Sequence, residues 1–155
     1  MKSMSLKTRV GWITAIEFKD KIIRVKFTKY KKNSKSKNLN KFKKNINKFF
    51  TRKSSSIKFD YYIVGSKTQK KVWNELKKIK FGRTKSYGDI AKKFKMSPRH
   101  VGKICGQNKI PLAIPCHRVI RSDGTLGGFS SRGGVKLKKK LLNFENQTTK
   151  LIDLS

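Results

Sequence analysis

The spacing of apolar residues in this chain changes at Gly65-Ser66, and that change is the strongest constraint on its fold. Before it, apolar and polar residues alternate as in β-strands; after it, apolar residues recur every three or four positions, as on a helix face. Strands in one half and helices in the other predict an α+β protein. We expect a small α/β unit at residues 1–64, a mainly helical domain at 65–147 and a tail at 148–155.

The first half shows one helical pattern between strand-like patterns. Residues 12–27 are typical of a β-hairpin, and the polar run at 29–38 is typical of a loop. Apolar residues at helical spacing predict a helix over 39–49. After a second polar loop at 51–56, the alternation over 57–63 predicts another strand.

Three helices are predicted in the second half. The first carries its apolar face from Val72 to Ile79 and ends at Phe81-Gly82. A second covers 86–94, and a third covers 98–105, with Ser97 as a good N-cap before a proline. The last two are short, closely linked and basic, which is typical of a helix-turn-helix.

The charge of the chain favours polyanionic partners. It has 41 Lys and Arg against 8 Asp and Glu, a formal charge of +33, so nucleic acid is the first candidate. The excess is mostly Lys and is spread over the whole length, a pattern that compositional drift of a genome also produces. No long basic helix with a clean apolar face supports a membrane-surface role.

The cysteine and histidine content excludes two kinds of stabilising site. With only Cys105 and Cys116, a disulfide framework is not expected, and a reducing compartment fits. His100 and His117 are the only histidines, so no four-ligand zinc spacing is present and no metal is expected. The chain lacks a signal-peptide pattern and a long apolar run, so we expect a soluble intracellular protein without membrane contact.

Cys116 is the candidate nucleophile. It lies in the sequence Ile-Pro-Cys-His-Arg-Val-Ile at 114–120, where two basic neighbours favour the reactive thiolate. The alternative is that Cys116 is a small buried apolar residue, since free cysteine is often buried. The stretch alone leaves both interpretations open.

The surrounding motifs decide between them. An upstream Gly-Gln-Asn at 106–108, Pro-Cys-His-Arg-Val at 115–119, a glycine-rich loop at 123–129 and Leu-Leu-Asn-Phe-Glu at 141–145 occur in this order. With them, the chain from about Gly65 to Glu145 resembles the O6-alkylguanine-DNA alkyltransferases, also called methylated-DNA--protein-cysteine methyltransferases. The combination is specific to that family.

The resemblance implies a catalytic role for five residues. Cys116 would accept the alkyl group from the guanine O6 atom, once and without a cofactor. His117 would take the thiol proton, through a water molecule, and Glu145 would orient the imidazole. Asn108 would bind the backbone around the cysteine turn, and the Tyr87 hydroxyl would donate to the guanine ring.

The resemblance also implies how DNA binds. The damaged nucleotide would be flipped out of a double strand, with Arg99 filling the gap and its helix in the minor groove. Residues expected in the base pocket are Val119, Gly128, Phe129 and Ser130. Residues expected to contact DNA are Ser97, Arg99, His100, Gly102 and Lys103. Two features depart from the family: the Tyr87–Arg99 segment is two residues short, and His100 replaces an alanine.

Family membership further implies a reduced ribonuclease H-like unit at the N-terminus and a winged-helix-like helix-turn-helix domain after it. The expected protein is a cytoplasmic monomer, associated with the nucleoid when it is bound to double-stranded DNA containing O6-alkylguanine. Two alternatives remain: a non-catalytic basic protein that binds DNA or recognises lesions, and a folded but inactive family member.

Overall fold

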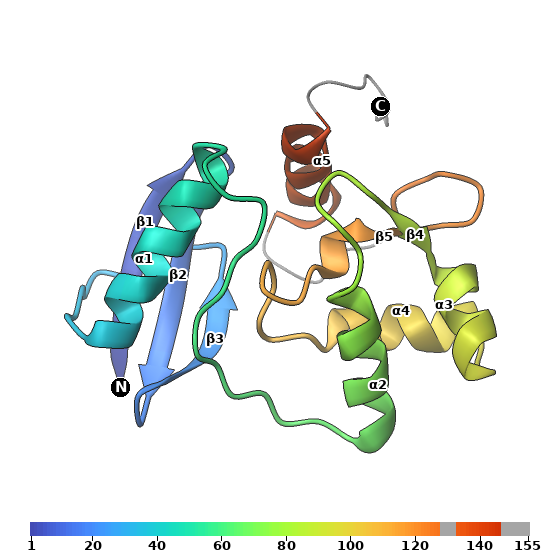
Figure 1. Ribbon diagram of the computed structural model, residues 1–155, viewed down its shortest axis with the longest axis horizontal. Coiled ribbons are helices and arrows are strands. Elements are labelled where there is room, and N and C mark those ends of the chain that lie inside the picture. Colours follow the sequence, from blue (N-terminus) through green and yellow to red (C-terminus); the bar gives the residue numbers. More distant parts are fainter. Residues whose placement is uncertain (128–132, 147–155) are drawn as a thin grey trace. The chain divides into compact units, whose positions relative to one another are not determined.

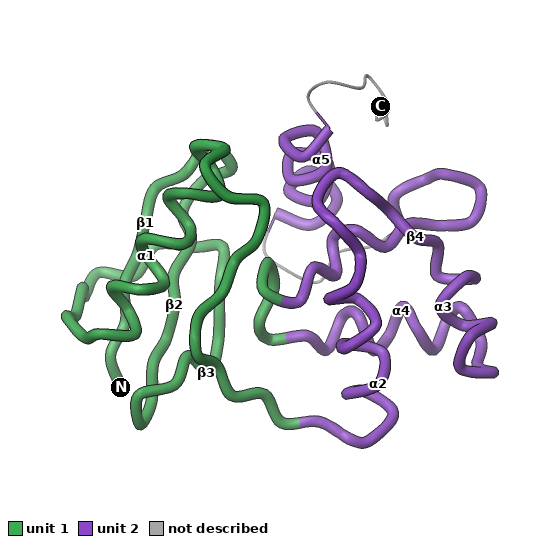
Figure 2. The backbone as a smooth tube through the Cα atoms, in the orientation of Figure 1, with its two compact units in different colours: residues 1–64, 109–113 green, residues 65–108, 114–155 purple. Residues whose placement is uncertain are grey.

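The computed structural model describes residues 1–127 and 133–146. The chain divides into two compact units, Met1–Val64 with Lys109–Ala113, and Gly65–Asn108 with Ile114–Ser155 (Figure 2). The segment Lys109–Ala113 was expected in the second part, but it groups with the first, where the Val25 amide donates to the Lys109 carbonyl at 3.0 Å. Across the described ranges, no helix has both the length and the apolar content needed to cross a membrane.

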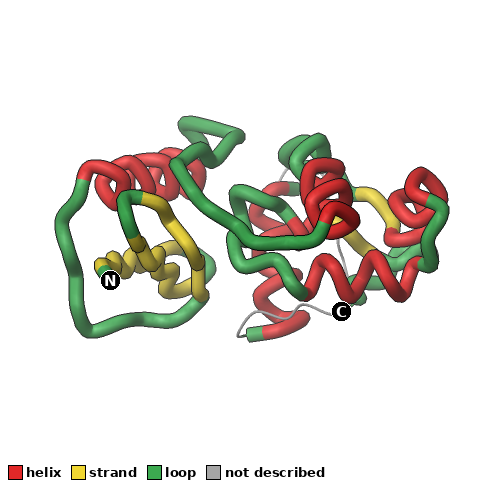
Figure 3. Tube along the Cα trace, turned by 90° about the horizontal axis from the view of Figure 1, so that it is seen from below, coloured by secondary structure: helices red, strands yellow, loops and turns green. Residues whose placement is uncertain are grey.

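Unit 1 is a three-stranded antiparallel sheet with one helix over a face of it (Figures 1 and 3). The strands β1 (Lys2–Thr8), β2 (Gly11–Phe18) and β3 (Lys21–Lys26) lie side by side in chain order. Lys19 and Asp20 both have positive φ, 48° and 62°, as a two-residue hairpin turn requires. The predicted hairpin is therefore confirmed.

Strand β1 was not predicted, although Met4 and Leu6 alternate with polar residues in it. Ser3 and Ser5 are buried, and hydrogen bonds compensate for the loss of water. The Ser5 hydroxyl lies 2.6 Å from the Thr14 hydroxyl on β2, and the Ser3 hydroxyl donates to the Lys32 carbonyl at 2.8 Å. These partners lie on other segments, so the strand depends on tertiary contacts.

Helix α1 (Lys37–Phe50) confirms the predicted helix of unit 1. Its N-cap is Ser36, whose hydroxyl accepts from the Leu39 amide at 2.9 Å, so the helix begins inside the expected loop. Leu39, Phe42 and Ile46 are fully buried in the core of unit 1. Burial of this apolar stripe stabilises the helix more than intrinsic propensity does.

The strand predicted over 57–63 is wrong. The segment makes one isolated parallel bridge, between Ile22 and Tyr61, and Phe59 is its one buried apolar residue. Phe59 packs edge-on against Phe42, with ring centroids 5.2 Å apart. The alternation therefore reflects one anchoring side chain beside the sheet and not a paired strand.

Unit 2 begins with three helices whose starts are set by serine caps. Helix α2 (Lys67–Leu76) ends earlier than predicted, because the chain continues after it in tighter turns. In one of these turns the Ile79 amide donates to the Leu76 carbonyl at 3.0 Å. Helices α3 (Tyr87–Phe94) and α4 (Pro98–Gly106) confirm the other two predictions. Lys95, with φ 54°, reverses the chain between them.

A two-stranded parallel ladder connects distant parts of unit 2. Strand β4 (Lys85–Ser86) precedes α3, and β5 (Val119–Ile120) follows the 3-10 turn η1 (Cys116–Arg118). Their pairing places the start of α3 beside the Cys116 turn. Helix α5 (Gly134–Glu145) completes the described part of the unit. The expected mixture of helices with small sheets is confirmed.

We predict that Asn38→Ala destabilises the protein. The Asn38 side chain donates to the carbonyls of Asp20 and Asp60, at 3.2 and 2.9 Å, and accepts from the Asp60 amide. Its loss removes three hydrogen bonds, although the Asp60 carbonyl still accepts from the Ile22 amide at 2.9 Å. We expect the unfolding free energy, measured by urea denaturation, to fall by about 1–3 kcal/mol. Asn40→Ala on the exposed face of α1 is the control; equal losses for both variants would contradict the prediction.

Candidate active site

Cys116 begins a buried 3-10 turn at the end of an apolar loop. The Cys116 amide donates to the Ile114 carbonyl at 2.8 Å, and the Arg118 amide donates to the Pro115 carbonyl at 3.0 Å. Asn108, just beyond α4, donates from its side chain to the same Ile114 carbonyl at 2.8 Å. The backbone that carries the thiol is therefore tied to the end of α4.

Glu145 in the last turn of α5 binds both residues that follow Cys116. Its Oε2 lies 2.6 Å from Nε2 of His117, and the Arg118 guanidinium donates to both carboxylate oxygens at 2.7 and 3.0 Å. Arg118 also donates to the Ile79 carbonyl at 2.7 Å. The His117 and Glu145 side chains are each 1% exposed. This buried network connects α5, η1 and the chain after α2.

The network fixes the charges of its members. Burial alone raises the pKa of Glu145, but the attraction and hydrogen bonds of His117 and Arg118 outweigh it and bring the pKa to about 2. Burial lowers the pKa of His117, against the pull of Glu145. Part of the lowering of the Glu145 pKa is the attraction of a charged His117; when burial keeps His117 neutral, the permanently charged Arg118 is the cation that holds Glu145 ionised.

Glu145 also selects the tautomer of His117. An ionised carboxylate only accepts hydrogen bonds, so Nε2 of His117 carries the proton and donates to it. Nδ1 then has a free lone pair, and among the described residues it is a buried polar atom without a hydrogen-bond partner. His117 thus has the form of a general base.

The Cys116 thiol is protonated in its resting state. Burial raises its pKa, and the hydrogen bond from Asn108 and the charge of Lys138 oppose that rise. A thiol with a raised pKa needs a base to become a nucleophile. His117 is the adjacent base.

Lys138 of α5 is a fully buried cation beside this group. It donates to the Val119 carbonyl at 2.6 Å and to the Tyr87 hydroxyl at 3.1 Å. Burial lowers the pKa of Lys138 to about 8 and raises that of Tyr87 to about 12. Because the Tyr87 oxygen accepts from Lys138, its own O–H is directed to another acceptor. A Cβ on Gly127 would lie 2.9 Å from the Tyr87 ring, so glycine is required there.

A cavity of about 710 Å³ opens beside Cys116. It is lined by residues of α3, α4, η1 and the segment after β5: Tyr87, Pro98, Arg99, Gly102, Cys105, Gly106, Cys116, Arg121, Ser122 and Gly127. Its size suits a small ligand or a nucleobase. In residues 1–127 and 133–146, no cluster of three or more His, Cys, Asp or Glu residues is arranged to hold a metal.

The five expected catalytic residues lie in one region of unit 2. Of the residues expected to contact DNA, some line the cavity and others lie on the exposed surface of α4. Arg99 and Gly102 line the cavity, whereas His100 and Lys103 are exposed on α4. Ser97 caps α4, accepting from the His100 amide at 3.1 Å. Among the base-pocket residues, Val119 is buried and its carbonyl accepts from Lys138. Gly128, Phe129 and Ser130 lie outside the described residues.

Two residues of the site were missed by sequence reasoning. Arg118 had no role assigned, yet it neutralises Glu145. Lys138 was not considered, although its spacing gives a signal: with Leu141, Leu142 and Glu145 it falls on one helix face, at i, i+3, i+4 and i+7. A lysine on the apolar face of a helix needs a partner, and that partner is visible only in the folded chain.

Comparisons with known proteins match the second part of the chain to one family. Residues 67–147 match the family described as 6-O-methylguanine DNA methyltransferase, DNA binding domain. A methylated-DNA--protein-cysteine methyltransferase of Methanocaldococcus vulcanius is 52% identical over 86 residues, 56% of this chain and 52% of that protein. The Saccharomyces cerevisiae protein of that name is 40% identical over 98 residues, 62% and 50% of the two chains. The chain thus spans about half the length of these curated relatives.

Solved structures extend the likeness to nearly the whole chain. The Mycobacterium tuberculosis O6-methylguanine methyltransferase superposes with a TM-score of 0.81 at 25% identity, covering 94% of this chain and 93% of that one. The structure titled as the OGT of that organism in complex with DNA gives a TM-score of 0.83 at 25% identity, covering 95% and 94%. Both units of this chain therefore have counterparts in a solved protein.

We predict that Glu145→Gln destabilises the fold at neutral pH, because it leaves the buried Arg118 charge uncompensated. The expected loss of unfolding free energy is about 3–5 kcal/mol, measured by urea denaturation. Since the folded pKa of Glu145 is depressed to about 2, its contribution is present above pH ~4.5 and is lost as the pH falls toward 2. The difference in unfolding free energy between the variant and the wild type should therefore shrink as the pH falls from ~4.5 toward 2. Asp20→Asn, at the exposed hairpin turn, is the control; a loss of stability independent of pH in Glu145→Gln would contradict the assignment.

Proposed function

The chain belongs to the 6-O-methylguanine DNA methyltransferase family, and from that membership we propose that it repairs DNA by transferring the alkyl group of O6-alkylguanine to its own Cys116. The observation that carries the proposal is the position of Cys116: it lines a cavity large enough to admit a nucleobase and is followed directly by the buried base His117. The names of the curated relatives support the same activity.

The reaction is a substitution at the alkyl carbon. His117 takes the thiol proton through Nδ1, directly or by way of a water molecule, and Glu145 stabilises the resulting imidazolium. The Cys116 sulfur forms a bond to the alkyl carbon as the carbon–O6 bond breaks, and the electron pair of that bond goes to the guanine. Tyr87 donates its hydroxyl proton toward the guanine ring as negative charge develops there; Lys138, which already donates to the Tyr87 oxygen, directs that O–H.

The product is a thioether, which has no good leaving group. Each molecule therefore acts once, and neither a cofactor nor a metal takes part in the proposed step. A protein consumed by its substrate in this way is a stoichiometric transferase.

Double-stranded DNA is the proposed partner. A base inside a duplex is out of reach of a buried thiol, so the damaged nucleotide is flipped into the cavity at a cost of a few kcal/mol. Arg99 at the cavity wall then fills the gap, α4 lies in the minor groove, and Ser97, His100, Gly102 and Lys103 of the same segment add DNA contacts. The solved complex of a structural neighbour with DNA supports this partner. Val119, with Gly128, Phe129 and Ser130, reads the base.

We also propose a fold type for each of the two units. We infer a reduced ribonuclease H-like unit from the meander of β1–β3 with α1, and a winged-helix-like domain from the α3–α4 pair. The proposed domain limits are 1–64, 65–147 and a tail at 148–155. The protein is proposed to act as a cytoplasmic monomer that associates with DNA; light scattering and cell fractionation test these two points.

The alternative of a non-catalytic DNA-binding or lesion-recognition protein is not favoured. A binder needs neither a thiol beside the cavity nor a buried base with its orienting carboxylate. An inactive family member is equally disfavoured, because all five residues proposed for the reaction are present in the chain: Cys116, His117, Glu145, Asn108 and Tyr87.

Incubation with excess duplex containing O6-methylguanine is expected to add one methyl group, once, to the protein. Intact mass spectrometry measures the shift, and peptide mapping locates it on Cys116. The Cys116→Ala variant is expected to gain nothing, whereas Cys105→Ala, which changes the other thiol at the cavity, should still gain one methyl group. Repeated turnover or an unchanged wild-type mass would refute the proposal.

His117→Gln is expected to slow methyl transfer by roughly 10²–10⁴-fold at pH 7, the usual loss when a general base is removed. Because burial raises the Cys116 pKa, hydroxide must then remove the proton, so the rate of the variant should rise about tenfold per pH unit. Single-turnover kinetics at saturating duplex measure both effects. A variant as fast as wild type at every pH would exclude His117 as the base.

A further inference from the structure

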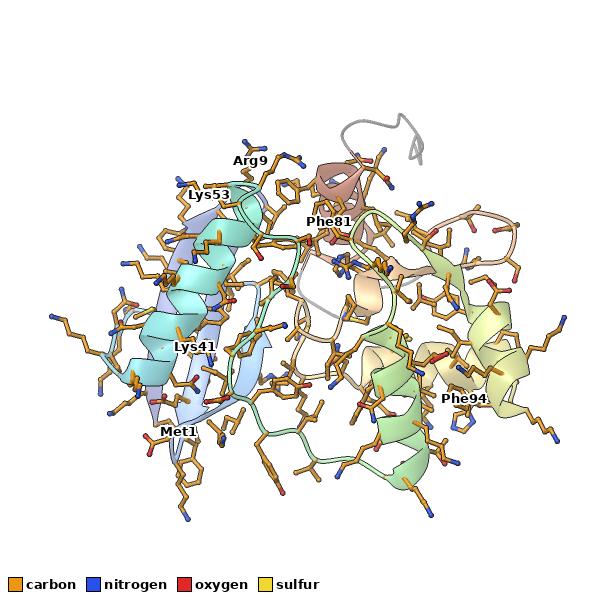
Figure 4. All side chains as sticks on the ribbon, in the orientation of Figure 1. Met1, Arg9, Lys41, Lys53, Phe81 and Phe94 are labelled. Atoms are coloured by element: carbon orange, nitrogen blue, oxygen red, sulfur yellow. The ribbon has the colours of Figure 1, made fainter. Side chains whose placement is uncertain are left out.

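Unit 1 concentrates positive charge on the outer face of α1. Residues 1–64 hold 19 Lys and Arg against three acidic residues, Glu17, Asp20 and Asp60. Helix α1 itself has five lysines in 14 residues and no acidic residue. All five lysines are exposed, and Figure 4 shows nitrogen-tipped side chains along this face, where Lys41 is labelled.

Four of these lysines form one straight row. At 100° per residue, Lys37, Lys41, Lys44 and Lys48 fall within an arc of about 60°, and at 1.5 Å per residue they span about 16 Å. We call these four residues the α1 lysine row. Within the described residues none of them forms an ion pair. Neighbours in the row are three or four positions apart, where like charges repel.

Acidic residues elsewhere in the described chain pair with some of its lysines, whereas α1 has no acidic residue of its own. In α2, Glu75 pairs with Lys78 at 3.1 Å and Lys93 at 2.7 Å. The buried acid of unit 1, Glu17, accepts from the Ser36 hydroxyl at 2.8 Å and is 2% exposed, so it does not neutralise the row. The charge of α1 is thus left for a partner outside the unit.

We propose that the α1 lysine row is a second nucleic-acid contact, which binds backbone phosphates of duplex DNA without reading sequence. The two strands together present one phosphate per about 1.7 Å of duplex axis, so a row of about 16 Å runs past several phosphates, and each of the four lysines can reach one. The lysine ammonium is a point charge on a flexible stem, suited to phosphates and not to base edges. The choice of DNA over RNA rests on the proposed function.

A membrane surface does not fit the same row. Insertion of an amphipathic helix into the lipid interface requires a free apolar face. The apolar side of α1, formed by Leu39, Phe42, Ile46 and Phe49, is at most 1% exposed because it packs in the core of unit 1. What remains exposed is polar and cationic, which favours a polyanion with closely spaced charges.

Binding of the full chain to an undamaged 20-base-pair duplex, followed by fluorescence anisotropy between 50 and 200 mM salt, tests the row. The variant replaces Lys37, Lys41, Lys44 and Lys48 by Gln, which has a helix propensity close to that of Lys. The slope of log affinity against log salt concentration should become less steep by about 3 to 4, since each lost phosphate contact removes about 0.9. A Lys→Arg variant at the same four positions should keep the wild-type slope.

The matched control removes the same charge elsewhere on unit 1, by Lys→Gln at the exposed positions 2, 7, 21 and 31. We expect its slope to change by less than about 1. Equal changes in the two Gln variants would overturn the proposal, because they would show a diffuse effect of net charge. A slope that changes with duplex RNA but not with duplex DNA would overturn it as well. The assay needs no alkyl transfer, so its failure is separate from a failure of the proposed function, which the mass shift reports.

Discussion

The Glu145 carboxylate, buried between His117 and Arg118, is the interaction on which the rest of the site depends. A buried carboxylate is costly unless cations and hydrogen bonds compensate for lost water. Here a bidentate guanidinium, an imidazole N–H and the Gly82 amide at 3.3 Å supply that compensation. His117 and Arg118 belong to the turn that begins at Cys116, and Gly82 belongs to the segment after α2. The carboxylate therefore fixes the end of α5 against both segments while it sets the form of the imidazole.

The reactive group is kept dormant by the same burial that shapes the cavity. Burial raises the Cys116 pKa and lowers that of His117, so the resting pair is neutral. Such a thiol resists indiscriminate oxidation and alkylation, because the thiolate is the reactive species. In the proposed reaction, the thiol becomes a nucleophile only when its proton passes to His117. Lys138, a fully buried cation near the sulfur, adds a field that favours the thiolate once the proton leaves.

The strong positive charge has different consequences in the two units. In unit 2 the buried cations Arg118 and Lys138 are paired with a carboxylate, a hydroxyl and carbonyls, and they organise the site. In unit 1 the cations are at the surface, where α1 buries its apolar stripe and exposes a row of lysines without acids. Compositional drift accounts for a lysine-rich surface, but a single-sign row on one helix face has a definite geometry and a definite partner to be tested.

Local signals in the sequence were sufficient for the elements that depend on short-range rules. The hairpin at Lys19-Asp20, the apolar stripe of α1 and the Ser97 cap of α4 follow from turn chemistry, helical period and capping, and each was predicted. The motif around Cys116 likewise identified the family before any contact was known. The sequence by itself therefore determined the fold class and the family, and it supplied the residue that we propose as nucleophile.

Tertiary structure decided what depends on partners distant in the chain. Strand β1 exists because Ser3 and Ser5 find partners on other segments, and residues 57–63 fail to pair because they meet β3 at one bridge. The roles of Arg118 and Lys138 could not be predicted for the same reason, because a buried cation is stable only beside a counter-charge or a hydrogen-bond acceptor. The partner of Arg118 is Glu145, 27 residues further along the chain, and Lys138 binds Tyr87, 51 residues before it. Electrostatic pairing acts through space, so it appears only when the chain has folded.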